Sequence, residues 1–438
     1  MIHLNSKISD FIRRILPALL AVMLITGGGM ISDFNAYAKT SSSRVKSSKK
    51  RGKASTRSKK RKSKRRRTAA KPVITTLWTG ENGEWIHKGR RDIIIHKDST
   101  GTVRAMTPFT INPHSGRDYA QAINDYARAL SDDGVRVYSL LAPTQGEYYM
   151  PDLTSTRGAE QRGIEVLSSY LDPSVTPVYI NDVLAEHIDE EIYNRTDHHW
   201  SPLGAHYAAS ALAKAAGVNF LPLESYSTDT LRNYVGTMYK FSGDPAVKDN
   251  PEEFVWYIPP TGYKAEFINY TISNNKTVGE SEKHEEPFFR RFSDGSAAAY
   301  CTFMGGDYRT AAVSNTGGTP GRRLLIVKDS YGNAMASNLF GSFEEVHVID
   351  FRYFPHNLVD YVRENGITDL CFVNCTSLAF AANTAARLRI MFEHKDANTA
   401  VEEPEAGADD ETDEETETEG SDEDEDSEES ENESENNE

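Results

Sequence analysis

Three residues of this 438-residue chain have the side-chain types that nucleophilic acyl transfer requires. Ser330 follows a strongly apolar run at 324–327 and precedes a helical pattern, whereas Asp197 and His199 lie far upstream, two residues apart. A serine hydroxyl is a weak nucleophile until a histidine takes its proton, and that histidine works best when a carboxylate holds its tautomer. The sequence therefore predicts Ser330 as nucleophile, His199 as base and Asp197 as the orienting carboxylate.

The local sequence around the two histidines predicts a rigid loop. Residues 196–200 follow a helical run over 182–192, and the Ser-Pro pair that comes next is a strong helix start, with serine as the cap and proline in the first turn. A short loop between two helices can hold a catalytic base in a fixed position. One turn can aim the carboxylate of Asp197 at the imidazole of His199, so His198 is expected to point elsewhere.

The elements that must position these residues alternate between strand and helix. The predicted strands are 135–141, 177–180, 324–327, 345–350 and 369–374, and the predicted helices are 117–131, 158–170, 202–216, 332–340, 357–365 and 377–392. This alternation predicts an α/β domain over 72–401, with a mainly parallel sheet covered on both faces. Residues 220–319 break the rhythm and predict an irregular, β-rich insertion that covers the site.

Polar residues follow three of the predicted strands. Ligands of open parallel sheets bind at the carboxyl ends of the strands, so these residues are expected to line one cleft with Ser330. The amides of Tyr331 and Gly332 open a helix and suit a developing oxyanion. The residues predicted to bind substrate or an oxyanion are Tyr331, Arg352, Tyr353, Asn374 and His198.

The first 38 residues predict an export signal. Basic residues near the start, an apolar run at 15–25 and a small-residue end at 36–38 have the order of a secretory signal. The apolar run is shorter than the ~20 residues that a membrane-spanning helix needs, and retention as an N-terminal anchor stays open as the alternative. We expect an exported protein of the periplasm or cell envelope.

Two segments of opposite charge flank the predicted domain. Residues 39–71 contain 17 Lys or Arg and no acidic residue, and residues 402–438 contain 22 Asp or Glu and no basic residue. Neither has the apolar content to form a core, so both are predicted to be disordered. After an export signal, the basic segment suggests an anionic surface and not nucleic acid, and a solvated spacer is the alternative.

Metal chemistry has little support in the sequence. The three cysteines, at 301, 371 and 375, show no paired zinc-ligand spacing and are expected to be small core residues. A site built from Asp197, His199 and His206 lacks a further well-spaced ligand. The sequence predicts no metal and no cofactor.

The segment 195–205, Arg-Thr-Asp-His-His-Trp-Ser-Pro-Leu-Gly-Ala, closely resembles the signature of the DHHW family. These are exported bacterial relatives of the alginate O-acetyltransferase type within the SGNH hydrolase superfamily. Segments 140–144, 327–331 and 350–354 resemble the family's other motifs in the same order. The resemblance spans roughly 130–392.

This resemblance implies a permuted SGNH hydrolase-like fold, in which Asp-x-His precedes the serine. It implies the same roles for Ser330, His199 and Asp197. Asn374 falls where such domains carry the asparagine of the oxyanion hole, although its neighbours depart from the usual context. Arg352 and Tyr353 stand in place of the glycine of the second SGNH block, as in other DHHW members.

Two classes of function follow. The triad can hydrolyse an acetyl ester or pass the acetyl group to a sugar hydroxyl, which implies an exported O-acetyltransferase or acetylesterase acting on a carbohydrate polymer. A transferase outside the cytoplasm needs a donor, for which a membrane-bound acetylated protein is the expected partner. The alternative is a non-catalytic glycan-binding or envelope assembly protein, which has no need of a hydrogen bond between His199 and Ser330.

Overall fold

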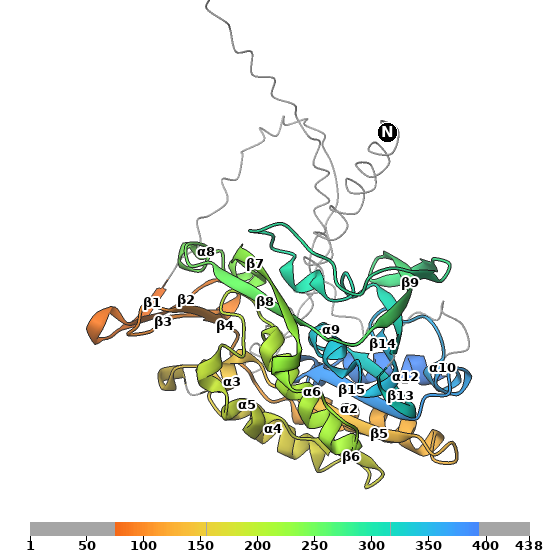
Figure 1. Cartoon of the computed structure of the whole chain (residues 1–438). Helices are drawn as coiled ribbons and strands as arrows, with labels where there is room; N and C mark the ends of the chain where they lie inside the picture. Colours follow the sequence, from red (N-terminus) through yellow and green to blue (C-terminus); the bar gives the residue numbers. More distant parts are fainter. Residues whose placement is uncertain (1–74, 155, 316, 394–438) are drawn as a thin grey trace, which may run out of the picture. The chain divides into compact units, whose positions relative to one another are not determined.

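The computed structural model describes residues 75–393 except 155 and 316, so the predicted export signal, basic segment and acidic tail lie outside the described residues. The described chain begins with a four-stranded antiparallel meander. Its strands are β1 (Thr75–Thr79), β2 (Trp85–Lys88), β3 (Ile94–Lys97) and β4 (Val103–Met106). This small sheet is drawn in orange on the left of Figure 1.

A nine-stranded central sheet follows, in the order β10-β9-β12-β14-β13-β15-β5-β6 with β11 paired to β9. The strands of its parallel half are β14 (Phe343–Asp350), β13 (Thr319–Lys328), β15 (Asp369–Cys375), β5 (Arg136–Ala142) and β6 (Val175–Val178). The antiparallel strands are β9 (Tyr263–Ser273), β10 (Lys276–Glu280), β11 (His284–Glu285) and β12 (Arg309–Asn315).

This topology changes two expectations. The sheet is mixed and not mainly parallel, because β12 pairs antiparallel with β14 and continues the sheet into β9 and β10. Residues 220–319 therefore do more than cover the site, since four of the strands in this stretch belong to the central sheet. The remaining two, β7 (Ser227–Tyr234) and β8 (Glu252–Ile258), form a separate antiparallel pair.

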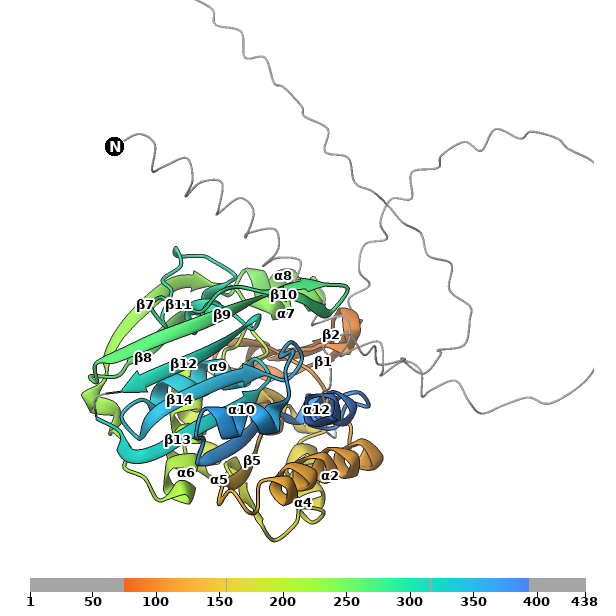
Figure 2. The same cartoon turned by 90° about the vertical axis from the view of Figure 1, so that its right-hand side faces the viewer.

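Helices cover the parallel half on both faces, and Figure 2 shows α2, α10 and α12 together on one of them. The helices packed on that face are α2 (Pro113–Ala129), α4 (Ala159–Ser168), α10 (Leu358–Glu364) and α12 (Thr384–Glu393). The opposite face carries α6 (Pro202–Ala216) and α9 (Tyr331–Ala336). Shorter helices are α3 (Gln145–Tyr149), α5 (Asn181–Ala185), α7 (Thr237–Ser242), α8 (Pro245–Lys248) and α11 (Thr376–Ala379).

The pleat of β13 explains this layering. Leu324 and Ile326 belong to the apolar cluster on the α6 face, and Leu325 and Val327 belong to the cluster on the α2 face. A strand buried on both faces needs a continuous apolar run, because successive side chains point to opposite sides. Among residues 75–393, no helix is long and apolar enough to cross a membrane.

Candidate active site

Ser330 lies in a tight turn between the end of β13 and the start of α9. The carboxylate of Asp329 holds this turn: its Oδ1 accepts a hydrogen bond from the Tyr331 amide at 3.0 Å, and its Oδ2 accepts one from the Cys375 amide at 2.7 Å. Since Cys375 ends β15, the turn is tied to the neighbouring strand. The position of Ser330 therefore follows from two adjacent buried strands.

The loop that carries the Asp-His pair closes on itself. A β-bridge joins Tyr193 to Trp200, and the Asn194 side chain donates to the Trp200 carbonyl at 2.9 Å. The cap predicted before α6 is present, with Ser201 Oγ accepting a hydrogen bond from the third residue of the helix. The Trp200 indole N–H donates to the Tyr331 carbonyl at 3.1 Å, which ties this loop to the start of α9.

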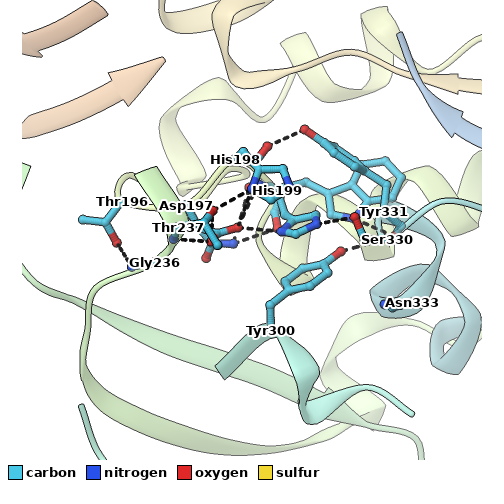
Figure 3. Close-up of polar contacts among 12 residues, drawn as sticks. Thr196, Asp197, His198, His199, Gly236, Thr237, Tyr300, Ser330, Tyr331 and Asn333 are labelled. Atoms are coloured by element: carbon cyan, nitrogen blue, oxygen red, sulfur yellow. Dashed lines mark hydrogen bonds and ion pairs between the residues drawn. The ribbon is translucent and has the colours of Figure 1, made fainter. Parts of the chain in front are cut away.

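The structure brings Ser330, His199 and Asp197 into one hydrogen-bonded chain (Figure 3). His199 Nε2 lies 2.6 Å from Ser330 Oγ, and His199 Nδ1 lies 2.6 Å from Asp197 Oδ1. An ionised carboxylate is an acceptor only, so Nδ1 carries the proton and the unprotonated Nε2 of the neutral ring accepts from the serine hydroxyl. This is the geometry in which a histidine can take the proton of a serine.

Asp197 is almost fully buried, and both of its oxygens are bonded. Its Oδ1 also accepts from the His199 amide at 3.1 Å, and its Oδ2 accepts from the amide and the hydroxyl of Thr237, each at 2.8 Å. Burial by itself raises the pKa of Asp197, but its electrostatic interactions with the rings of His199 and His198 and these hydrogen bonds outweigh the effect of burial. The pKa lies well below its usual range, so the carboxylate is ionised at neutral pH.

The ring of His199 lies between two other rings. Tyr300 stacks on it with a centroid distance of 3.7 Å and an interplanar angle of 4°, and the His198 ring lies at 3.8 Å, tilted by 37°. The Tyr300 hydroxyl donates to the Tyr331 carbonyl at 3.3 Å. Figure 3 shows Tyr300 beside His199, with Ser330 at the end of the imidazole. These contacts hold the base in one plane.

The described contact of the His198 ring nitrogen Nδ1 is with Thr237 and Asp197, and His199 is the histidine that meets Ser330. His198 Nδ1 lies 2.7 Å from Thr237 Oγ1 and 3.7 Å from Asp197 Oδ1. Burial and then the neighbouring His199 lower the pKa of His198 to about 3. His198 is therefore neutral at neutral pH, and the structure does not pair it with Ser330.

The helix amides expected to bind an oxyanion are already bonded. The Tyr331 amide donates to Asp329 Oδ1, and the Gly332 amide donates to the Asp329 carbonyl at 3.1 Å. Tyr331 instead contacts the site through its side chain, whose hydroxyl donates to the His198 carbonyl. The expectation of a free amide pair is wrong, because the turn uses these two amides to hold its own shape.

Asn374 does not join the triad either. Its side chain is fully buried, and its Oδ1 accepts a hydrogen bond from the Tyr119 hydroxyl on α2 at 2.7 Å. Successive residues of a strand face opposite sides, and Val373 and Cys375 belong to the apolar cluster on the α9 face. Asn374 therefore faces the α2 side of the sheet, which corrects the expectation that it lines the cleft.

Arg352 lies in a buried cluster of charges. Its Nη2 lies 2.6 Å from Asp350 Oδ2 and 2.9 Å from Asp307 Oδ2, and Lys328 Nζ lies 2.9 Å from each of these two residues. Asn333 of α9 donates to Asp307 Oδ1 at 2.8 Å. This cluster joins the ends of β13 and β14 to α9, so the described contacts of Arg352 are structural.

Tyr353 packs away from the triad. It is buried in the apolar cluster of the α2 face, where its ring meets that of Tyr308 edge to face at 4.5 Å. The substrate-binding role expected for Tyr353 has no counterpart in these contacts. A sequence pattern places a residue after a strand, but it does not say toward which face the chain turns next.

The metal alternative does not assemble as proposed. Within residues 75–393, the group with metal-ligand spacing is Asp197, His198 and His199, whose donor atoms all lie within 4.8 Å of one another. The nitrogen and oxygen atoms that meet there are engaged with each other and with Thr237. His206 lies elsewhere, with Nδ1 3.0 Å from Asn338 Oδ1.

Some residues of the segment 220–319 contact the triad, and the sequence did not predict them. Thr237 contacts both Asp197 and His198, and Tyr300 stacks on His199. Gly236 lies so close to Asp197 that an added Cβ would sit 2.5 Å from Oδ2. A Gly-Thr pair opening a short helix is a common pattern, so its sequence signal is weak.

These observations define an α/β protein with a Ser-His-Asp chain at the carboxyl edge of its parallel strands. The model of the DHHW protein family matches residues 104–349, and the chain belongs to the DHHW family. A solved DHHW family protein from Eubacterium siraeum has 33% sequence identity, with a TM-score of 0.60 over 73% of this chain and 97% of that chain. The family resemblance seen in the sequence is confirmed.

A second solved structure shares the fold at lower identity. PatB1 from Bacillus cereus, in a form with a sulfonyl adduct, has 18% identity and a TM-score of 0.51, over 65% of this chain and 97% of that chain. A second structure of the same protein gives 20% identity and the same TM-score. No curated protein matches the chain at a significant level.

Proposed function

We propose that this DHHW family protein is an exported acyl-transfer enzyme of the SGNH-like type, an O-acetyltransferase or acetylesterase acting on a carbohydrate of the cell envelope or an exported polymer. The observation that carries the proposal is the chain from Ser330 Oγ through His199 to Asp197, with 2.6 Å at both contacts. A non-catalytic scaffold has no need of these two hydrogen bonds. The existence of a sulfonyl adduct of PatB1, which has the same fold, is consistent with a reactive group in this kind of protein.

The chemistry proceeds in two steps. As Ser330 Oγ attacks the carbonyl carbon of an acetyl ester, His199 Nε2 takes the hydroxyl proton, and the ionised Asp197 stabilises the resulting imidazolium. The C–O bond to the leaving alcohol breaks, and His199 returns the proton to that oxygen. Water or a sugar hydroxyl then attacks the acetyl-serine with His199 as base again, which gives acetate or an acetylated sugar.

The direction of transfer depends on which nucleophile reaches the acetyl-serine. Outside the cytoplasm a transferase needs a donor, for which a membrane-bound acetylated protein is the proposed partner. The basic segment 39–71, with 17 cationic residues, would favour an anionic surface such as an acidic polymer. The proposal needs no metal and no cofactor.

The test compares the full-length chain with its Ser330→Ala variant on a chromogenic acetyl ester, followed by intact-mass analysis. We expect hydrolysis and one added acetyl group in the parent protein, and neither in the variant. The matched control is Ser337→Ala, because Ser337 is buried just after α9 and its hydroxyl has no partner among the described residues. Equal hydrolysis by the Ser330→Ala variant would exclude this nucleophile, and no hydrolysis or labelling by the parent would favour the scaffold alternative.

A sugar hydroxyl can be tested as acceptor in the same assay. Adding oligosaccharides of envelope polymers should divert acetyl from water to sugar if the protein is a transferase, and mass spectrometry would detect the acetylated product. Release of acetate alone at every acceptor concentration would identify an esterase.

A further inference from the structure

We propose that Thr237 is a positioning residue of the triad, which fixes the orientation of Asp197 and the tautomer of His198 through one hydroxyl group. This inference rests on the proposed function and deepens it. Thr237 is the first residue of α7, far in sequence from both the Asp-His loop and the serine. Figure 3 shows Thr237 beside Asp197, and its hydroxyl contacts both Asp197 and His198.

The directions of the hydrogen bonds follow from the number of protons. Asp197 is ionised and can only accept, so the single hydroxyl proton of Thr237 points to Asp197 Oδ2, 2.8 Å away. Thr237 Oγ1 must then accept in its other contact, at 2.7 Å from His198 Nδ1. His198 therefore carries its proton on Nδ1. The chain runs in one direction, from His198 through Thr237 to Asp197.

This arrangement leaves one carboxylate oxygen for the base. Oδ2 of Asp197 takes two hydrogen bonds from Thr237, one from its amide and one from its hydroxyl, and Oδ1 faces the Nδ1 and the amide of His199. Gly236 closes the side of the carboxylate, since an added Cβ would meet Asp197 Cβ at 2.4 Å. Rotation of the carboxylate would break bonds at both oxygens, so its direction toward His199 is fixed.

The two residues that flank Thr237 are both bonded to Thr196. The Gly236 amide donates to Thr196 Oγ1 at 3.0 Å, and the Met238 amide donates to the Thr196 carbonyl at 3.0 Å. Thr196 is anchored in turn, because its own amide donates to the buried Glu252 at 2.7 Å. The start of α7 is therefore fastened to the residue that precedes Asp197.

The N-terminal meander supports α7 from the other side. Met238 and Phe241 of α7 share an apolar cluster with Ile93 and with Ile95 of β3. The Ala105 amide of β4 donates to the carbonyl of the residue before Thr196, at 3.0 Å. A small sheet with no reacting group thereby supports Thr237.

The protonation of His198 affects the neighbouring base, His199. His198 and His199 lie with ring centroids 3.8 Å apart, so a charged His198 would oppose the imidazolium that forms on His199. Burial and the neighbouring His199 keep the His198 ring uncharged. By accepting a hydrogen bond from Nδ1–H, the Thr237 hydroxyl favours the Nδ1–H tautomer of this neutral ring over the Nε2–H tautomer. Asp307 and Arg352 also act on His198 from the charge cluster, with opposite signs.

The experiment uses full-length Thr237→Val and Thr237→Ser. Valine keeps the shape and the backbone amide but removes the hydroxyl, whereas serine keeps the hydroxyl. We expect Thr237→Val to lower kcat for the chromogenic ester about 10- to 100-fold, the range for losing a hydrogen bond to a charged group, and to leave KM within about twofold. Thr237→Ser should recover at least half of the lost kcat. Sulfonylation of Ser330 by a sulfonyl fluoride should slow in parallel in the valine variant.

Thr310→Val is the matched control, because Thr310 of β12 is buried and its hydroxyl is hydrogen-bonded to the Tyr270 hydroxyl at 2.6 Å. The valine variants should lose similar thermal stability, but only Thr237→Val should lose kcat. An unchanged kcat in Thr237→Val, or an equal loss in Thr237→Ser, would overturn the positioning role. Loss of activity in Ser330→Ala together with full activity in Thr237→Val would remove this inference and leave the proposed function standing.

A second measurement remains decisive where Thr237→Val fails to fold. Nitrogen NMR of ¹⁵N-histidine-labelled parent protein, assigned with His198→Gln, should show the neutral Nδ1–H tautomer for His198 at pH 7. A neutral ring with its proton on Nε2, or a charged ring, would contradict the hydrogen-bond direction on which the proposal depends.

Discussion

The two halves of the candidate site are supported in different ways. Ser330 is positioned by β13, by β15 and by the Asp329 carboxylate of its own turn, all within one pair of parallel strands. Asp197 and His199 depend on residues outside these strands, with Thr237 and Gly236 at the carboxylate and Tyr300 against the imidazole. The nucleophile follows from the pairing of two core strands and from the turn between β13 and α9, and the acid-base pair depends on segments that pack against its loop from outside the parallel strands.

The largest effect is expected when the acid-base half of the site loses the charge of Asp197. Asp197→Asn keeps the shape of the side chain but no longer favours the required His199 tautomer or balances the imidazolium, so we expect kcat to fall by about 10⁴-fold. Steady-state ester hydrolysis measures the loss, and near-UV circular dichroism checks the fold. Activity within tenfold of the parent would show that Asp197 does not orient the base.

The next largest effect is expected on stability, in the buried charge cluster that contains Lys328 and Arg352. Asp307→Ala leaves Lys328 and Arg352 with one buried carboxylate partner fewer, which should cost about 3–5 kcal/mol of unfolding free energy. Urea unfolding measures this. The control is Arg232→Ala. The Arg232 side chain lies 3.8 Å from Glu253, and the two side chains are 70% and 64% exposed, so the loss of this ion pair should cost about 1 kcal/mol or less of unfolding free energy. Similar costs for the two variants would contradict the structural role of the cluster.

Gly236→Ala tests the packing around the carboxylate alone. The new Cβ would lie 2.5 Å from Asp197 Oδ2, so the carboxylate or α7 must move, and a shift of about 1 Å can cost about 100-fold in kcat. Gly279→Ala is the control, because its Cβ would meet only Thr271, at 3.9 Å. If Gly236→Ala keeps the parent kcat, the acid-base half tolerates displacement better than the comparison implies.

The smallest effect concerns a buried carboxyl beside the strand ends. Burial is the main cause that raises the pKa of Glu160 from 4.5 to about 7, although Thr144 and Thr376 donate hydrogen bonds to it. An acid whose pKa is raised on folding stabilises the fold below pH 4.5 and loses that contribution as pH rises through 7. Its share of the loss is about 2–3 kcal/mol.

Glu160→Gln should therefore flatten the pH dependence of unfolding between pH 5 and pH 8. Urea unfolding at the two values measures the difference between parent and variant. Glu165→Gln, an exposed position on the same helix, is the control and should keep the parent slope. An unchanged slope in Glu160→Gln would mean that Glu160 is already ionised in the folded protein at pH 5.

Several elements were predictable because their signals are local. The helix 202–216 occurs with the predicted bounds, since Ser201-Pro202 starts it and Gly217 ends it in a left-handed conformation. The five parallel strands lie within a few residues of their predicted positions, with β13 extending further toward its start. The role of 220–319 was not predictable in the same way, because β12 pairs with β14 and β9 through contacts that leave no local pattern.

The three candidate residues, the family and the order of the buried strands along the chain could be predicted from the sequence, because residue type, spacing and apolar runs are properties of neighbouring positions. Three other features come from the tertiary structure: Asn374 faces α2, the Tyr331 amide bonds to Asp329, and Thr237 meets Asp197. These outcomes depend on which face a strand end presents and on which distant segment packs against it. Such choices come from the burial of whole layers, and a motif does not encode them.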